Sequence, residues 1–164
     1  MEFSNRKPNR LSNFSYSQYG SYFITVCTEN KLPLLCTVQR GTVFEPPAVI
    51  HSRYGRIVEE QIQTLSHFYP DIRIDKYVIM PNHIHMIVTI SKDNAPAEKS
   101  FNDRIPFLIS TLKRFTNRKS GISLRQGSYY DHVIRNDCDY HNILKYIEDN
   151  PAKWAEERFY VEER

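Results

Sequence analysis

Apolar and polar positions alternate along the chain with two different periods, and these periods predict an ordered series of strands and helices. Runs rich in β-branched and aromatic residues, typical of strands, cover residues 22–28, 72–80, 83–90 and 129–134. Apolar residues recur at helical spacing over residues 50–67, 103–118 and 137–150. Pro81-Asn82 joins the second and third strands as an antiparallel hairpin, and Pro151 is expected to end the last helix.

The resulting order is β-α-β-β-α-β followed by a helix. It predicts an α+β fold, a ferredoxin-like sandwich with an antiparallel sheet and an added C-terminal helix. With 164 residues, the chain is expected to form a single domain. In that domain we expect residues 1–20 to be an irregular arm, residues 29–48 a connection, and residues 151–164 a C-terminal tail.

Composition and charge narrow the class of protein. The hydrophobic fraction of 40% is ordinary for a folded chain, and no apolar stretch is long enough to span a membrane. Three cysteines without a Cys-x-x-Cys pair favour a reducing, cytoplasmic setting. The net charge of +3 says little about the binding partners of the protein. Its distribution, basic over 101–120 and acidic over 148–164, fits an anionic partner that meets one face.

Two histidines, His83 and His85, stand two positions apart in an apolar, β-branched run. Because successive side chains of a strand point to opposite faces, both rings are expected on one face, with Ile84 and Met86 in the core. Neutral imidazoles placed side by side can bind one divalent cation. Taken alone, the pair is equally compatible with two hydrogen-bonded histidines on a half-exposed strand.

The helix predicted over 137–150 carries Tyr146 and Asn150 four residues apart. At about 100° per residue they form one stripe beside the apolar arc of the helix. If the helix packs near the histidine strand, Tyr146 can attack a metal-held phosphate, and Asn150 can supply a third ligand suited to Mg²⁺ or Mn²⁺. The plainer alternative is a tyrosine that only packs and an asparagine that caps the helix before Pro151.

A basic row lies on the helix predicted over 103–118, opposite its apolar stripe. Such a row can follow the phosphates of a nucleic acid, while nearby aromatic rings stack on unpaired bases. An ordinary solvated helix face is the alternative. The expected DNA contacts are Lys113, Arg114 and Arg118 of this helix and Arg135 after the last strand. The aromatic candidates are Phe115, Tyr129 and Tyr130.

Four segments follow one another along most of the chain: Tyr16-Ser17-Gln18-Tyr19-Gly20, Met80-Pro81-Asn82-His83-Ile84-His85, Tyr130-Asp131-His132-Val133-Ile134-Arg135-Asn136 and Tyr146-Ile147-Glu148-Asp149-Asn150-Pro151. In this order they make the chain resemble the REP-associated tyrosine transposases, within the single-tyrosine HUH class. The specific part is the His-hydrophobic-His motif with a downstream Tyr-x-x-x-Asn helix. Arg125 and Gly127 depart from the Trp and Arg that related chains commonly carry, which leaves the DNA preference open.

The resemblance implies a divalent metal, Mg²⁺ or Mn²⁺, and cleavage of single-stranded or hairpin DNA. The family's metal-binding histidines map onto His83 and His85, its nucleophile onto Tyr146 and its metal-binding amide onto Asn150. Tyr146 would then form a 5′-phosphotyrosine and release a 3′-hydroxyl, and reversal would join new ends without ATP. Such a protein is expected in the cytoplasm, on the nucleoid when bound to DNA. The class allows either a monomer or a homodimer.

Two other functions stay open at this level. A catalytically silent module that binds single-stranded nucleic acid also suits a ferredoxin-like sheet with exposed aromatic residues. A zinc-dependent hydrolase is disfavoured, because no third His, Cys or acidic residue stands at ligand spacing. The joint presence of His83, His85, Tyr146 and Asn150 favours the transposase, since a simple binding module has no need of a metal site.

Overall fold

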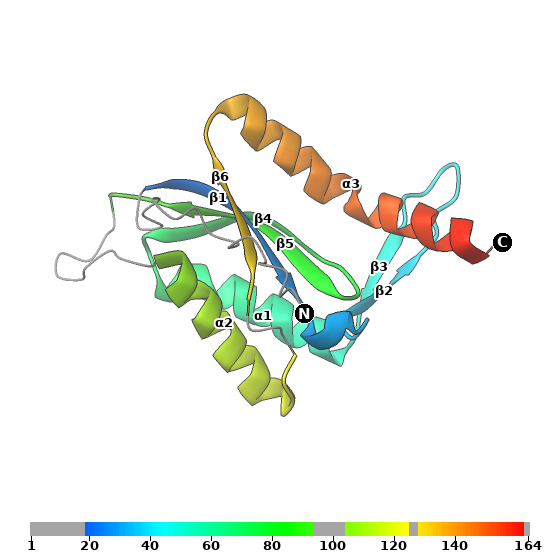
Figure 1. The fold of residues 1–164 in the computed structure, drawn as a ribbon, viewed down its shortest axis with the longest axis horizontal. Coiled ribbons are helices and arrows are strands. Elements are labelled where there is room, and N and C mark those ends of the chain that lie inside the picture. The colour runs from blue at the N-terminus through cyan, green and yellow to red at the C-terminus, as the bar shows by residue number, and fades with distance from the viewer. Residues whose placement is uncertain (1–18, 94–103, 125–127, 163–164) are drawn as a thin grey trace, which may run out of the picture.

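A four-stranded antiparallel sheet in the order β4-β5-β1-β6 forms the centre of the protein (Figure 1). The computed structural model describes residues 19–93, 104–124 and 128–162. The strands are β1 (Gly20–Cys27), β4 (Ile72–Ile79), β5 (His83–Ile90) and β6 (Tyr130–Ile134). Helices α1 (Arg53–Phe68) and α2 (Arg104–Ser120) cover one face, and α3 (Asp137–Glu162) lies over the other. The predicted α+β, ferredoxin-like fold with an added C-terminal helix is confirmed.

The sheet separates two hydrophobic cores, as the alternation along β1 and β5 requires. The larger core joins Ile24 of β1 and Met86 of β5 to α1 and α2. The smaller core joins Phe23 and Ile87 to Ile147 of α3. Since His83 and His85 share the face of Ile87, the histidine pair lies on the α3 side of the sheet.

A second, smaller sheet lies where a plain connection was predicted. After the 3-10 turn η1 (Glu29–Lys31), β2 (Cys36–Gln39) and β3 (Ala48–His51) pair as an antiparallel hairpin. The helix predicted from residue 50 therefore begins only at Arg53, because residues 48–51 pair with β2. Ser52 caps it, since its Oγ accepts a hydrogen bond of 3.1 Å from the Gly55 N–H.

Helix α3 does not end at Pro151, so the predicted tail from residue 151 is wrong as far as Glu162. A proline inside a helix removes the hydrogen bond to the carbonyl four residues back and costs about 3 kcal/mol or more. Packing offsets this cost here: Ala155 is buried, the Trp154 ring contacts His83, and the helix packs on β2 (Figure 1). Asn150 therefore lies inside a helix and does not cap its end.

The first half of α3 is held on the sheet by the side chain of Asp75 in β4. Its Oδ2 accepts hydrogen bonds from Tyr140 of α3 (3.0 Å) and from Thr89 of β5 (2.7 Å), while Arg73 donates to Oδ1. Burial by itself raises the pKa of Asp75, but the hydrogen bonds from Arg73, Thr89 and Tyr140 outweigh it and lower the pKa below its ordinary value. Asp75 therefore stays ionised and orients the helix that carries Tyr146.

Some sequence predictions fall outside the described ranges. They concern Tyr16-Ser17-Gln18 and most of the N-terminal arm, together with Arg125 and Gly127. Within the described ranges, none of the helices is both long and apolar enough to cross a membrane. Cys27, Cys36 and Cys138 are all free thiols.

Candidate active site

His83 and His85 lie side by side at the start of β5, directly after the Pro81-Asn82 turn. Their ring centroids are 4.5 Å apart. His85 is buried and His83 half-buried. Two rings at this separation can direct nitrogen atoms toward one point, as the strand alternation predicts.

One nitrogen of each ring is already engaged by a neighbouring side chain. His85 Nδ1 lies 2.7 Å from the Oγ1 of Thr25, which stands opposite it on β1. His83 Nδ1 lies 2.7 Å from the Oδ1 of Asn82. Metal-binding histidines typically use one nitrogen for the ion and donate from the other to a supporting group. The Nε2 atoms of both rings are therefore the ones positioned to bind a metal.

Both rings are held in the neutral form that binds metals. Burial, together with the neighbouring His83, lowers the pKa of His85 to about 3. Burial also lowers the pKa of His83, and the positive charge of Lys31 adds to this, although a hydrogen bond with Asn150 opposes it. At neutral pH the pair offers two uncharged imidazoles.

Helix α3 brings Tyr146 and Asn150 to the histidines. Asn150 is buried and lies close to the His83 side chain. The Tyr146 ring lies 5.3 Å from the His85 ring and edge-on to Phe23 at 6.0 Å, with 41% of its surface exposed. The structure thus gathers the four residues His83, His85, Tyr146 and Asn150 in one place, with the phenol open to a ligand from solvent.

Two residues of α3 that the sequence reasoning missed complete the cluster. The Lys153 Nζ lies 5.2 Å from the centroid of the Tyr146 ring, and the Trp154 ring lies 6.0 Å from the His83 ring. Both were missed because the helix was expected to end at Pro151. Extending the helical spacing beyond Pro151 would have predicted both residues on this face of the helix, since Trp154 follows Asn150 by four residues and Lys153 follows Tyr146 by seven.

The donor set fits a small divalent cation. Within the described residues, no group of three or more His, Cys, Asp or Glu side chains could hold a metal ion. The Asn150 amide oxygen, next to His83, could serve as a third ligand for an ion at His83 and His85. Three neutral protein ligands would leave the other coordination positions of the ion to phosphate oxygens and water, the hard ligands that Mg²⁺ and Mn²⁺ prefer.

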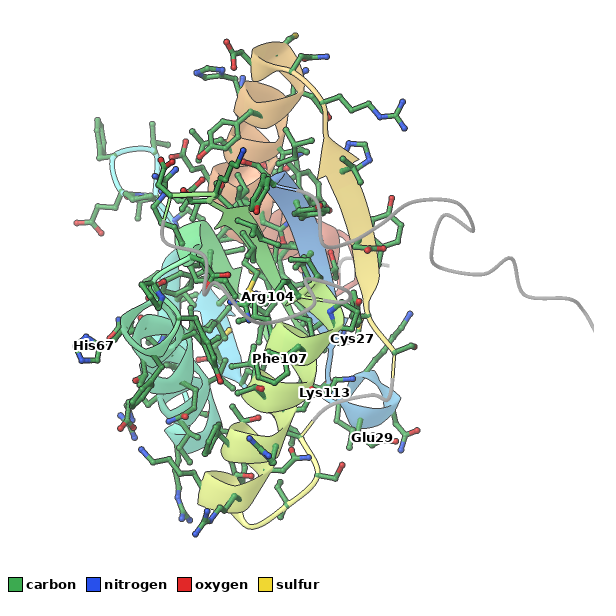
Figure 2. All side chains as sticks on the ribbon, turned by 90° about the vertical axis from the view of Figure 1, so that its left-hand side faces the viewer. Cys27, Glu29, His67, Arg104, Phe107 and Lys113 are labelled. Carbon is green, nitrogen blue, oxygen red and sulfur yellow. The ribbon has the colours of Figure 1, made fainter. Side chains whose placement is uncertain are left out.

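The basic residues of α2 do not lie at this site. Lys113, Arg114 and Arg118 belong to a helix on the opposite face of the sheet from α3 (Figure 2, where Arg104, Phe107 and Lys113 mark α2). DNA held at the histidines would reach them only by passing around the sheet. Arg135 is exposed directly after β6, next to the start of α3.

The three aromatic candidates for base stacking also separate. Tyr129 is 8% exposed and belongs to the larger core, so its predicted availability for stacking is wrong. Phe115 is partly exposed, but it lies on α2. Tyr130 is 52% exposed and stands opposite Thr25 of β1. His85 stands opposite Thr25 on the other side of β1, so Tyr130 and His85 lie on the same face of the sheet.

Two known proteins are similar to this chain in sequence over most of its length. The chain matches no family model. An uncharacterised protein of Haemophilus influenzae is 30% identical over 96% of this chain and 94% of its own length, so the two belong to one family. A REP-associated tyrosine transposase of Escherichia coli K12 is 27% identical over 84% of this chain and 70% of its own length. The chain is therefore similar in sequence to a REP-associated tyrosine transposase.

A solved structure of a REP-associated tyrosine transposase bound to a REP hairpin has the same fold. It matches with a TM-score of 0.61 at 20% identity, over 88% of this chain and 73% of that one. The resemblance expected from the sequence motifs is confirmed by the sequence similarity to the Escherichia coli transposase, whereas the roles of His83, His85, Tyr146 and Asn150 stay predictions.

Proposed function

We propose that the protein is a metal-dependent enzyme that cleaves and rejoins single-stranded or hairpin DNA through a covalent bond to Tyr146. The observation that carries this proposal is that the exposed Tyr146 ring lies against His85, whose ring adjoins that of His83, with Asn150 beside this neutral histidine pair. A tyrosine that only packed would have no need of this donor set. The relationship to a named transposase, and the REP hairpin bound by the solved relative, support DNA as the substrate.

Each residue has a defined part in the reaction. His83, His85 and Asn150 would hold Mg²⁺ or Mn²⁺, which when bound polarises a non-bridging oxygen of the scissile phosphate. The Tyr146 Oη gives up its proton and attacks the phosphorus in line. The bond from phosphorus to the 3′-oxygen breaks, and that oxygen takes up a proton to become a free 3′-hydroxyl. The DNA is then joined to Tyr146 through its 5′ phosphate.

The covalent bond conserves the energy of the broken phosphodiester, so no ATP is needed. A 3′-hydroxyl from the same or another strand can attack the phosphotyrosine, which restores the phenol and joins the ends. The Lys153 ammonium group beside the Tyr146 ring adds positive charge where negative charge develops. All of these side chains come from a single chain, so either a monomer or a homodimer would contain a complete site.

A covalent-adduct assay tests the proposal. End-labelled hairpin DNA with single-stranded flanks is incubated with Mg²⁺ or Mn²⁺ and separated on a denaturing gel. We expect a protein–DNA adduct with wild type that is lost in Tyr146→Phe, in His83→Ala and in EDTA. Tyr130→Phe is the matched control, because Tyr130 is an exposed tyrosine on the same face of the sheet. It should form the adduct normally.

Two results would contradict the proposal. An adduct that survives Tyr146→Phe would mean that another residue is the nucleophile. Tight, metal-independent binding of the same DNA with no adduct would support the catalytically silent binding module instead.

A further inference from the structure

The β2–β3 hairpin ends in an apolar tip that the described part of the chain leaves uncovered. Val43 and Phe44 are each 95% exposed. Nevertheless, the tip has a defined shape. The Oγ1 of Thr42 accepts hydrogen bonds from the backbone N–H groups of Phe44 (3.3 Å) and Glu45 (3.1 Å). Gly41 lets the two sides of the loop meet, because a Cβ there would collide with the Glu45 carbonyl oxygen.

This tip lies beside the half of α3 that follows the candidate active site. A cavity of about 580 Å³ separates the loop from the helix, and Ala152 and Ala155 form its wall on the helix side. Figure 1 shows the hairpin next to this part of α3. Ala155 follows Asn150 by five residues, which is about 7.5 Å along a helix. The helix wall of the cavity therefore begins a short distance along α3 from the candidate active site.

The chemistry of the tip and cavity suits a nucleic-acid base better than a phosphate. An aromatic ring held in solvent by a stiff loop offers a face on which an unpaired base can stack. The cavity is lined by Arg40 and by the carboxylates of Glu45 and Glu156, so acidic groups outnumber the one cation and disfavour a phosphate, while the three side chains can donate to and accept from the edge of a base. A contact between two tips in a dimer would bury only a few side chains, well below the roughly 1,200 Å² of a stable interface.

We propose that the Val43-Phe44 tip stacks on an unpaired base of the DNA substrate, on the α3 side of the phosphate that Tyr146 attacks. The cavity between the tip and α3 receives the edge of that base. The position along the DNA rests on the proposed function, since it is given relative to the phosphate at Tyr146. The stacking itself is a separate property of the hairpin.

A fluorescence experiment tests the stacking. The probe is a DNA hairpin with single-stranded flanks that carries 2-aminopurine at one flank position at a time, and EDTA prevents cleavage. Wild type should quench the fluorescence at one or two neighbouring positions. Phe44→Trp should keep this quenching, and Phe44→Ala should lose it. Phe44→Ala should also weaken binding of the flanked hairpin about tenfold, with unchanged binding of a blunt hairpin.

The matched control is Phe68→Ala, because Phe68 is an exposed phenylalanine (70%) at the end of α1, on the opposite side of the sheet. It should behave as wild type. Equal quenching and equal affinity in Phe44→Ala and wild type would overturn the proposal. So would a Phe44→Ala variant that changes only the association state of the DNA-free protein, because the tip would then be a contact between copies.

The adduct assay on the same DNA separates this inference from the proposed function. Quenching that depends on Phe44, with no adduct at Tyr146, would contradict the proposed function and support the stacking. An adduct at Tyr146, with no effect of Phe44→Ala, would support the proposed function and contradict the stacking.

Discussion

Replacing Thr25 with valine is expected to weaken divalent-metal binding while leaving the protein folded. Thr25 stands opposite His85 in the sheet, with its Oγ1 2.7 Å from the Nδ1 atom of the ring. Valine has nearly the same shape but no hydroxyl, so the substitution removes the group that orients the imidazole. The Nε2 atom of His85 would then no longer be fixed toward the metal.

The magnitude follows from the type of contact that is lost. Loss of a group that supports a metal-binding histidine typically weakens metal affinity about 10–100-fold, which corresponds to about 1.4–2.7 kcal/mol. Loss of the same hydrogen bond should lower the free energy of unfolding by only about 0.5–1.5 kcal/mol. This is a small part of the roughly 5–15 kcal/mol that stabilises a typical domain. The effect on metal binding should therefore be measurable in folded protein.

Titration calorimetry with Mn²⁺ measures the affinity, and urea denaturation of the same samples measures the stability. His85→Ala should abolish binding and sets the lower limit. Thr37→Val, at an exposed threonine of β2, is the matched control and should bind as wild type. A Thr25→Val variant with the Mn²⁺ affinity of wild type would refute the reasoning, because His85 would then not depend on this support.

Three further predictions test other parts of the account. Lys153→Met should slow adduct formation about tenfold, which corresponds to ~1.4 kcal/mol in activation free energy, because the cation beside the Tyr146 ring is lost. Lys145→Met, at another exposed lysine of α3, is the control and should not slow it. Equal rates for the two variants in gel time courses would exclude a role for the Lys153 cation. Hydrogen bonds hold the pKa of Asp75 below its ordinary value, so its stabilising effect is present above about pH 4 and is lost as the pH falls through the folded-state pKa. The Asp75→Asn variant should therefore have a free energy of unfolding about 1–3 kcal/mol below that of wild type at neutral pH. Urea denaturation should show that this difference becomes smaller toward about pH 2. A difference that does not change with pH would contradict the stabilising role of the ionised Asp75 carboxylate. Burial raises the pKa of Cys36 to about 12, so iodoacetamide at pH 8 should alkylate the exposed Cys138 first, as peptide mass spectrometry would show; equal labelling would contradict this.

The candidate site could be found from the sequence because its residues obey local periods. His83 and His85 share a face through the two-residue repeat of a strand, and Tyr146 and Asn150 share a stripe through the helical repeat. Neither relation depends on how distant segments pack. The supporting Thr25 could not be found in this way, since only the register of β1 against β5 places it opposite His85.

Other features depend on tertiary packing that the sequence pattern does not report. The period of α2 correctly places Lys113 and Arg114 away from the core, but it does not say which face of the sheet the helix covers. Pro151 predicts a helix end, and packing of the following turns on β2 and His83 overrides that local preference. The β2–β3 hairpin was missed because its strands have only four residues each and Pro46 and Pro47 directly precede β3.

The most direct test of the central claim is to identify the atom that carries the DNA. The covalent adduct formed with Mn²⁺ is digested with a nuclease and trypsin, and the modified peptide is sequenced by mass spectrometry. We expect a nucleotide attached through its 5′ phosphate to Tyr146. A nucleotide on any other residue, or one attached to Tyr146 through its 3′ phosphate, would contradict the account.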